Sequence, residues 1–225
     1  MTPRYRLTGV TKYYGDKIAL ELESLTILPG RIYVLTGDNG SGKSTLLSIL
    51  AFLSRPERGE IEFDGKLVEW KNAELQLLRR QVTLLHQSPY LFTGTVFGNV
   101  AYGLKLRGQK DEALKQRVAE ALALVRLAGF ETRNVRQLSG GEARRVALAR
   151  ALALQPVVLL FDEPLANLDQ ISAEVVDEII TTLPSQGTTV VVATHDPQQA
   201  GRLGGDTIRL ADNKLDRLPT GHCME

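Results

Sequence analysis

Short apolar runs recur along the chain and predict buried strands. Four of them are rich in β-branched residues and end in polar residues or glycine: residues 31–37 (RIYVLTG), 81–87 (QVTLLHQ), 157–163 (VVLLFDE) and 188–194 (TTVVVAT). Continuous apolar runs of this length are typical of a sheet that is covered on both faces. We therefore predict that these four segments are strands of one covered sheet.

Segments with helical periodicity alternate with these strands. They include residues 43–53 (KSTLLSILAFL) and 172–183 (SAEVVDEIITTL). Strands that alternate with helices indicate a mostly parallel sheet core. Residues 4–14 and 61–68 resemble antiparallel strands instead, and the second contains Asp64-Gly65 as a turn signal. The chain is therefore predicted to be an α/β protein with an antiparallel β part near its N-terminus.

One region interrupts the alternation, because strand signals disappear from about residue 88 to residue 137. Within it, apolar side chains fall on one helical face at Leu114, Val118, Ala121, Leu122 and Val125. Asp111 is predicted to cap the start of this helix and Gly129 to stop it. We therefore expect a single domain, residues 1–225, with a helical subdomain inserted at about 88–137.

Composition and charge narrow the function classes. The 225 residues are 43% hydrophobic and 24% charged, which suffices for a sizeable core. A formal net charge of +1 gives no general attraction to nucleic acid, so no nucleic-acid partner is expected. Neither a signal peptide nor the roughly 20 apolar residues of a membrane span is apparent, so a cytoplasmic location is expected.

The one cysteine agrees with a reducing compartment. Cys223 cannot form an internal disulfide. His222 beside it suggests a metal ligand, but the pair is read instead as part of a frayed terminus.

A glycine-rich loop between a predicted strand and a predicted helix indicates phosphate binding. Residues 37–44 (GDNGSGKS) match the pattern G-x-x-x-x-G-K-[ST] in the required context. Glycines let successive amides converge on phosphates, while Lys43 adds charge and the Ser44 hydroxyl can ligate Mg²⁺. The alternative is a glycine turn that only caps a helix, but such a turn would not need a lysine and a hydroxyl at these motif positions. The predicted nucleotide-binding residues are Gly37, Asp38, Asn39, Gly40, Ser41, Gly42, Lys43, Ser44 and Thr45.

Two carboxylates follow the apolar run at residues 157–161. Asp162 is predicted to assist Mg²⁺, and Glu163, one residue further, to polarise an attacking water. An isolated Asp-Glu pair usually marks a solvated strand end, but here the phosphate loop lies upstream. Together these parts predict a P-loop nucleotide triphosphatase.

A second anion site is predicted at residues 137–150 (QLSGGEARRVALAR). Ser139, Gly140 and Gly141 precede a helix marked by apolar positions, so backbone amides and a positive helix end face outward there. The apolar positions are Val146, Leu148, Ala149 and Leu152. A chain that binds one nucleotide has no obvious use for both sites.

The segment from Leu138 to Glu142 (LSGGE) resembles the signature of ATP-binding cassette (ABC) ATPases, and the resemblance extends over nearly the whole chain. Other positions match family motifs in the family's order: Tyr14 the aromatic that stacks on adenine, Gln87 the Q-loop, Asp169 in LANLD the D-loop and His195 the switch histidine. Glu142 departs from the glutamine most common in the family, and no loss of activity is expected from it.

The resemblance implies a use for the second anion site. In this family two cassettes face each other head to tail, and the signature of one closes over the γ-phosphate bound by the other. The resemblance also implies ATP and Mg²⁺ as cofactors. It implies a second cassette as partner, which we expect to be another copy of this chain. Catalytic roles would fall on Lys43, Gln87, Glu163 and His195, with Gln87 also a metal ligand. Ser139, Gly140, Gly141 and Asp169 would contact the nucleotide.

The resemblance implies a motor for membrane transport, attached to the inner face of the membrane by a separate permease and, in an importer, served by an extracytoplasmic binding protein. A soluble ABC protein of translation or DNA repair is an alternative. Such proteins resemble two fused cassettes or a cassette split by a long coiled coil, and this sequence has neither feature. A P-loop kinase of small molecules is a further alternative, but such an enzyme would not need the LSGGE segment. Residues 91–108 resemble importers of phosphate, molybdate and especially tungstate. Oxyanion import is therefore expected, with amino-acid import or export as alternatives.

Overall fold

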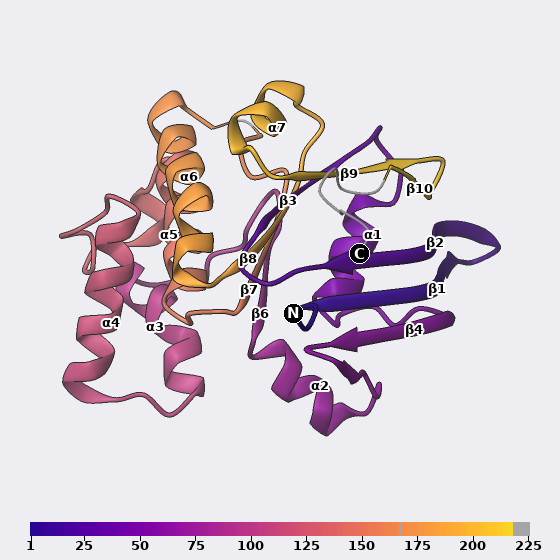
Figure 1. Cartoon of the computed structure of the whole chain (residues 1–225). Helices are drawn as coiled ribbons and strands as arrows, with labels where there is room; N and C mark the ends of the chain where they lie inside the picture. The colour runs from indigo at the N-terminus through magenta and orange to yellow at the C-terminus, as the bar shows by residue number, and fades with distance from the viewer. Residues whose placement is uncertain (167, 218–225) are drawn as a thin grey trace. The chain divides into compact units, whose positions relative to one another are not determined.

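The computed structural model describes residues 1–166 and 168–217, which form two compact units (Figure 1). Unit 1 comprises Met1–Leu84, Val157–Pro164 and the chain from Ile180 onward. Unit 2 comprises Leu85–Pro156 and Leu165–Ile179. In this described part of the chain, no helix has the length and hydropathy needed to cross a membrane.

Unit 1 is built on a mixed sheet, which has ten strands within the described residues. Its order is β5-β4-β1-β2-β10-β9-β3-β8-β7-β6. The strands are β1 (Tyr5–Tyr14), β2 (Lys17–Ile27), β3 (Ile32–Thr36), β4 (Arg58–Phe63), β5 (Lys66–Leu67), β6 (Val82–Leu85), β7 (Val158–Asp162), β8 (Thr189–Ala193), β9 (Asp206–Ala211) and β10 (Lys214–Arg217).

The centre of this sheet is parallel, as the sequence predicts. Strand β3 pairs in parallel with β8 and β9, and β7 pairs in parallel with β8. Strands β3, β7 and β8 are buried along nearly their whole length. Their carboxyl ends therefore meet at one edge, where α/β sheets bind ligands.

The predicted antiparallel part is also present (Figure 1). Strand β1 pairs antiparallel with both β2 and β4, and β4 turns into β5 through Asp64-Gly65. Both turn residues have positive φ, as a tight hairpin requires. Strands β2, β9 and β10 are not among the predicted strands.

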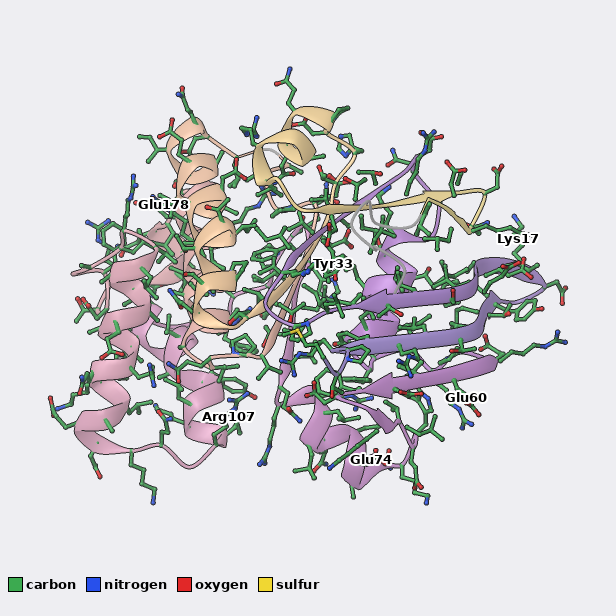
Figure 2. All side chains as sticks on the ribbon, in the orientation of Figure 1. Lys17, Tyr33, Glu60, Glu74, Arg107 and Glu178 are labelled. Carbon is green, nitrogen blue, oxygen red and sulfur yellow. The ribbon has the colours of Figure 1, made fainter. Side chains whose placement is uncertain are left out.

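Three helices complete unit 1: α1 (Lys43–Leu50), α2 (Asn72–Arg79) and α7 (Pro197–Leu203). Helix α1 packs against β7 and β8 and buries Leu46, Leu47 and Leu50 in the core. Tyr33, labelled in Figure 2, is buried in the same core and its hydroxyl accepts a hydrogen bond from the Leu28 N–H at 2.8 Å. The buried leucines of α1 position the helix against the parallel strands.

Unit 2 is helical and includes the predicted insertion. It contains α3 (Val96–Leu106), α4 (Asp111–Leu124), α5 (Gly140–Leu152) and most of α6 (Gln170–Thr182). Helices α3, α4 and α5 pack against one another (Figure 1). Their shared interior is apolar, because α3, α4 and α5 bury residues such as Val100, Val118 and Val146.

The ends of α4 differ from the prediction. Asp111 is the first residue of the helix and not its cap, because Lys110 occupies the N-cap position and contributes no side-chain hydrogen bond. The helix ends at Leu124, well before Gly129. Arg126 adopts a left-handed φ of 56°, which stops the helix earlier.

Candidate functional site

The glycine-rich loop connects β3 to α1 in unit 1. Gly42 is the N-cap of α1, with a φ of 99°, and no side chain caps this helix end. The first N–H groups of a helix have no partners within it, and the helix dipole adds a partial positive charge there. The loop therefore presents uncapped donors toward an anion.

Close packing explains why the loop begins with glycine. Gly37 has a φ of 144°, and a Cβ placed on it would overlap the backbone carbonyl oxygen of Leu210 on β9. Ser41, in the same loop, is buried, and its Oγ has no hydrogen-bond partner among the described residues. Buried polar atoms normally have partners, so this hydroxyl suits a ligand that accepts hydrogen bonds.

The Lys43 side chain folds back onto the backbone of the phosphate loop. Lys43 Nζ donates to the carbonyl oxygens of Gly37 at 2.7 Å and Asp38 at 2.9 Å. The residue is only 6% exposed. The ammonium is therefore held among the loop's own backbone, in the position from which it can neutralise phosphate charge.

Glu163 turns sharply away from the end of β7 and contacts His195. Glu163 has a φ of 50°, an uncommon left-handed conformation for this residue, and its N–H donates to Ala193 O at 2.9 Å. Its Oε2 lies 2.7 Å from His195 Nδ1. The Glu163 side chain is 14% exposed and that of His195 62%. The structure thus brings these two predicted catalytic residues together at the ends of β7 and β8.

A cavity of about 570 Å³ connects the phosphate loop to this histidine within unit 1. Its lining includes Gly37, Asp38 and Asn39 of the loop, together with His195 and Arg209. Ligand pockets commonly have about 300–1,000 Å³. The cavity is therefore large enough for part of a bound ligand.

Tyr14 ends β1 in the hairpin that leads to β2, and Lys17 lies at the outer end of the same hairpin (Figure 2). The tyrosine is 57% exposed. A Cβ on Gly42 would lie 2.8 Å from the Ala19 carbonyl oxygen on β2, so the hairpin adjoins the phosphate loop. An exposed aromatic ring is therefore carried by the hairpin next to the loop.

Two of the predicted magnesium ligands, Ser44 and Asp162, lie in unit 1 and offer oxygen donors. Ser44 is exposed in the first turn of α1, and Asp162 ends β7, against which α1 packs. Hydroxyl and carboxylate oxygens suit Mg²⁺, which usually keeps water and phosphate ligands as well. Gln87, the third predicted ligand, is an exposed residue of unit 2.

The signature segment forms the start of α5 in unit 2. Ser139 is the N-cap, its Oγ accepts from the Glu142 N–H at 3.2 Å, and Glu142 Oε2 accepts from the Ser139 N–H at 2.8 Å. Either glutamate or glutamine can close such a capping box. The box explains why Glu142 is accommodated, and it leaves the N–H groups of Gly140 and Gly141 outside these bonds.

Asp169 lies against this helix start, also within unit 2. It accepts hydrogen bonds from the Ser172 N–H at 2.9 Å and the Ser172 hydroxyl at 2.8 Å. These bonds from the Ser172 backbone and side chain lower the pKa of Asp169 from its ordinary value. A Cβ on Gly141 would overlap both Asp169 Oδ2 and Ser172 Oγ. The structure thus joins two predicted motifs through Ser172, which sequence reasoning missed.

Gly141→Ala is expected to destabilise the fold, because overpacking a tight contact typically costs about 1–3 kcal/mol. Thermal unfolding followed by circular dichroism measures the effect. Gly140→Ala is the matched control, since a Cβ there meets nothing within 4 Å in the same helical turn. Equal unfolding temperatures for the two variants would contradict this account of Gly141.

His222 and Cys223, together with Asn167 of the LANLD segment, lie outside the described residues. Within residues 1–166 and 168–217, no three His, Cys, Asp or Glu side chains are grouped as metal ligands.

Known proteins resemble this chain in sequence and in fold. The sequence profile of the family described as ABC transporter matches residues 20–166. The Fe(3+) ions import ATP-binding protein FbpC of Escherichia coli O157:H7 is 42% identical over 221 residues, covering 97% of this chain and 60% of that protein. Phosphate import ATP-binding protein PstB 2 of Natronomonas pharaonis is 39% identical over 220 residues, covering 93% of this chain and 77% of that protein.

The relatives differ in length from this chain, which spans 59% to 63% of iron import proteins of the FbpC type. A solved structure matches over nearly its full length. The ATP-binding cassette MJ0796, in a dimeric post-hydrolysis state bound to ADP and Pi, is 33% identical with a TM-score of 0.83. The match covers 95% of this chain and 97% of that one. The predicted fold class is therefore confirmed.

Proposed function

Since the chain belongs to the ABC transporter family, we propose that it binds and hydrolyses ATP as the ATPase subunit of a membrane transporter. The observation that carries the proposal is the contact between Glu163 and His195 at the strand ends that adjoin the phosphate loop. A nucleotide-binding protein without hydrolysis would need the loop but not this pair.

The binding step uses the loop and the Tyr14 ring. Uncapped amides at the start of α1 receive the phosphates, and Lys43 exchanges its bonds to the Gly37 and Asp38 carbonyls for bonds to phosphate oxygens. Tyr14 stacks on the base. Magnesium held by Ser44 and Asp162 would neutralise charge on the phosphates.

The hydrolytic step uses Glu163 as the group that orients and polarises water. Its φ of 50° directs the carboxylate away from the line of β7, and the contact to His195 Nδ1 fixes its rotamer. A positioned base of this kind typically contributes about 10²–10⁴-fold in rate. His195 is then a residue that holds the carboxylate in its working position.

A second copy completes the site in this proposal. Ser139 and Gly140 are exposed at the start of α5. There the Ser139 hydroxyl and the N–H groups of Gly140 and Gly141, which lie outside the capping box, suit the γ-phosphate held by the facing cassette. Asp169 shapes the same segment through its contact with Gly141. ATP binding would then favour the closed pair, and hydrolysis would release it. The dimeric state of the matched MJ0796 structure supports this arrangement.

The cargo is proposed to be a small inorganic ion that is imported. The relatives are named for Fe(3+) and phosphate import, whereas the resemblance of residues 91–108 favours an oxyanion such as tungstate. A separate permease on the inner face of the membrane, with an extracytoplasmic binding protein, would complete the system. Purification of the chain from its native membrane, followed by identification of the bound permease and its ligand, tests this proposal. A soluble translation or repair factor as the stable partner would contradict it.

ATP turnover by the purified chain tests the enzymatic part. Phosphate release is expected with ATP and Mg²⁺, and is expected to stop on chelation of the metal. Release of phosphate without transfer to an added small-molecule acceptor separates an ATPase from a kinase. A chain that binds ATP but releases no phosphate, alone or with its permease, would contradict the proposal.

Tyr14→Ala is expected to weaken ATP and GTP binding alike, by about tenfold, because stacking on a ring face does not read the edges of a base. Competition binding with both nucleotides measures this effect. Unchanged affinity for both would show that Tyr14 does not stack on the base.

A further inference from the structure

The β1–β2 hairpin holds a buried cation against one face of the Tyr14 ring. Lys12 lies two residues before Tyr14 and is buried, although Tyr14 itself is 57% exposed. Lys12 Nζ lies over the ring, 5.5 Å from its centroid. An ammonium at this distance is attracted to the negative face of an aromatic ring. A register shift in the β1–β2 pairing between Lys12 and Tyr13 accompanies this arrangement.

Groups on the segment before β4 hold the ammonium in place. Lys12 Nζ donates to the Arg55 carbonyl oxygen at 2.8 Å and to Glu57 Oε1 at 2.7 Å. Glu57 Oε2 accepts the Tyr13 N–H at 2.8 Å. The bond from Lys12, followed by the one from Tyr13, lowers the pKa of Glu57, so this carboxylate is ionised at neutral pH. Two of the three ammonium donors are therefore used, and the third is available to the ring.

A purely structural role does not explain this lysine well. Burying an ammonium costs free energy unless it is paired, and an apolar side chain of similar length would fill the same place without that cost. Its partner Glu57 is largely exposed, so the ion pair itself adds little stability. The bonds to Arg55 and Glu57 hold the ammonium in place, and the contact with the ring is what this placed charge adds at the surface of the hairpin.

We propose that Lys12 is a positioning residue for the nucleotide base: its ammonium binds one face of Tyr14 and holds the ring so that the opposite face receives a purine. An exposed tyrosine otherwise loses rotamer freedom when a ligand binds, and fixing the ring beforehand reduces that loss. The hairpin adjoins the phosphate loop through Ala19 and Gly42, so a nucleotide on the loop has its base near this ring. The inference rests on the proposed ATP-binding function.

The test compares ligands with and without a base. Calorimetry on the full chain measures the affinities of ATP, ADP and inorganic tripolyphosphate for Lys12→Met, Lys12→Arg and a control, Lys66→Met, which removes the same charge from exposed β5. Lys12→Met is expected to weaken ATP and ADP by about two- to fivefold, the size of an exposed cation–π contact, and to leave tripolyphosphate unchanged. Lys12→Arg, which keeps a cation, and Lys66→Met are expected to bind all three ligands like wild type.

A double-mutant cycle with Tyr14→Ala tests whether Lys12 acts through the ring. In the Tyr14→Ala background, Lys12→Met is expected to have no further effect on ATP affinity. An equal effect in both backgrounds, or an equal loss of tripolyphosphate binding, would overturn the proposal. Lys12→Gln, which can still donate to Glu57 without a charge, gives the same comparison if Lys12→Met does not fold. A wild-type chain that binds neither ATP nor tripolyphosphate would instead contradict the proposed function itself.

Discussion

Lys43→Ala is expected to abolish productive ATP binding, with a loss of affinity of at least about 100-fold. Lys43 supplies the buried cation at the centre of the loop, where its ammonium already makes two short hydrogen bonds to backbone carbonyls. On ATP binding these would be exchanged for bonds to phosphate oxygens, and a hydrogen bond between two charged groups contributes about 1.5–3 kcal/mol, so the loss of two such bonds accounts for a change of this size. Calorimetric titration with ATP and Mg²⁺ measures the affinity.

The controls for this variant must distinguish the effect of removing the Lys43 charge from the effect of destabilising the fold. Lys66→Ala removes one positive charge from an exposed strand of the same sheet and is expected to bind ATP normally. Thermal unfolding of Lys43→Ala reports on the loop carbonyls of Gly37 and Asp38, which lose their donor. Near-normal affinity and turnover in Lys43→Ala would contradict the assignment of this loop to phosphate binding.

Local sequence patterns predicted the parts of the fold that local interactions determine. The phosphate loop was predictable because its glycines, lysine and hydroxyl act within nine consecutive residues, Gly37 to Thr45. Strands β3, β7 and β8 were predictable because they are buried on both sides and therefore nearly all apolar. Strand β2 has no such continuous run, because buried leucines alternate in it with Glu21 and Glu23; this alternation is itself typical of a half-buried strand, so β2 was predictable and was missed.

Contacts between distant residues could not be predicted in this way. The Lys12 to Glu57 pair joins residues 45 positions apart, and it exists only because β1 and β4 are neighbours in the sheet. The close approach of Asp169 to Gly141 likewise depends on how the segment before α6 packs against α5. At the start of α4 a local pattern was misleading. Asp111 is of a residue type that often caps helices, but it lies one position inside the helix.

Glu163→Gln is expected to keep ATP binding and to slow hydrolysis by about 10²–10³-fold, the usual loss when one positioned polar group is removed from an active site. Glutamine has the same shape and can still contact His195 Nδ1, so the turn at the end of β7 should be preserved. It cannot polarise water as a carboxylate does. ATP then persists long enough to trap two cassettes in the closed pair, which light scattering after size-exclusion chromatography detects as an ATP-dependent dimer.

Adding Ser139→Arg to Glu163→Gln is expected to abolish this dimer while each chain still binds ATP. Ser139 is exposed at the start of α5, so a bulky side chain there blocks the approach of a facing γ-phosphate and leaves the chain's own loop in unit 1 unchanged. The substitution also removes an N-cap, at a cost of about 0.5–2 kcal/mol. Ser139→Ala removes the same cap without added bulk and should weaken the dimer less.

These variants separate a composite site from a self-contained one. If closure requires the signature of a second copy, the dimer depends on both ATP and Ser139, and titration of Glu163→Gln chains gives two bound ATP molecules per dimer. If each chain hydrolyses ATP alone, Glu163→Gln binds ATP and stays monomeric at high concentration, and Ser139→Arg by itself leaves turnover unchanged. The second outcome would contradict the use proposed here for the uncapped amides of Gly140 and Gly141, because no partner phosphate would reach them.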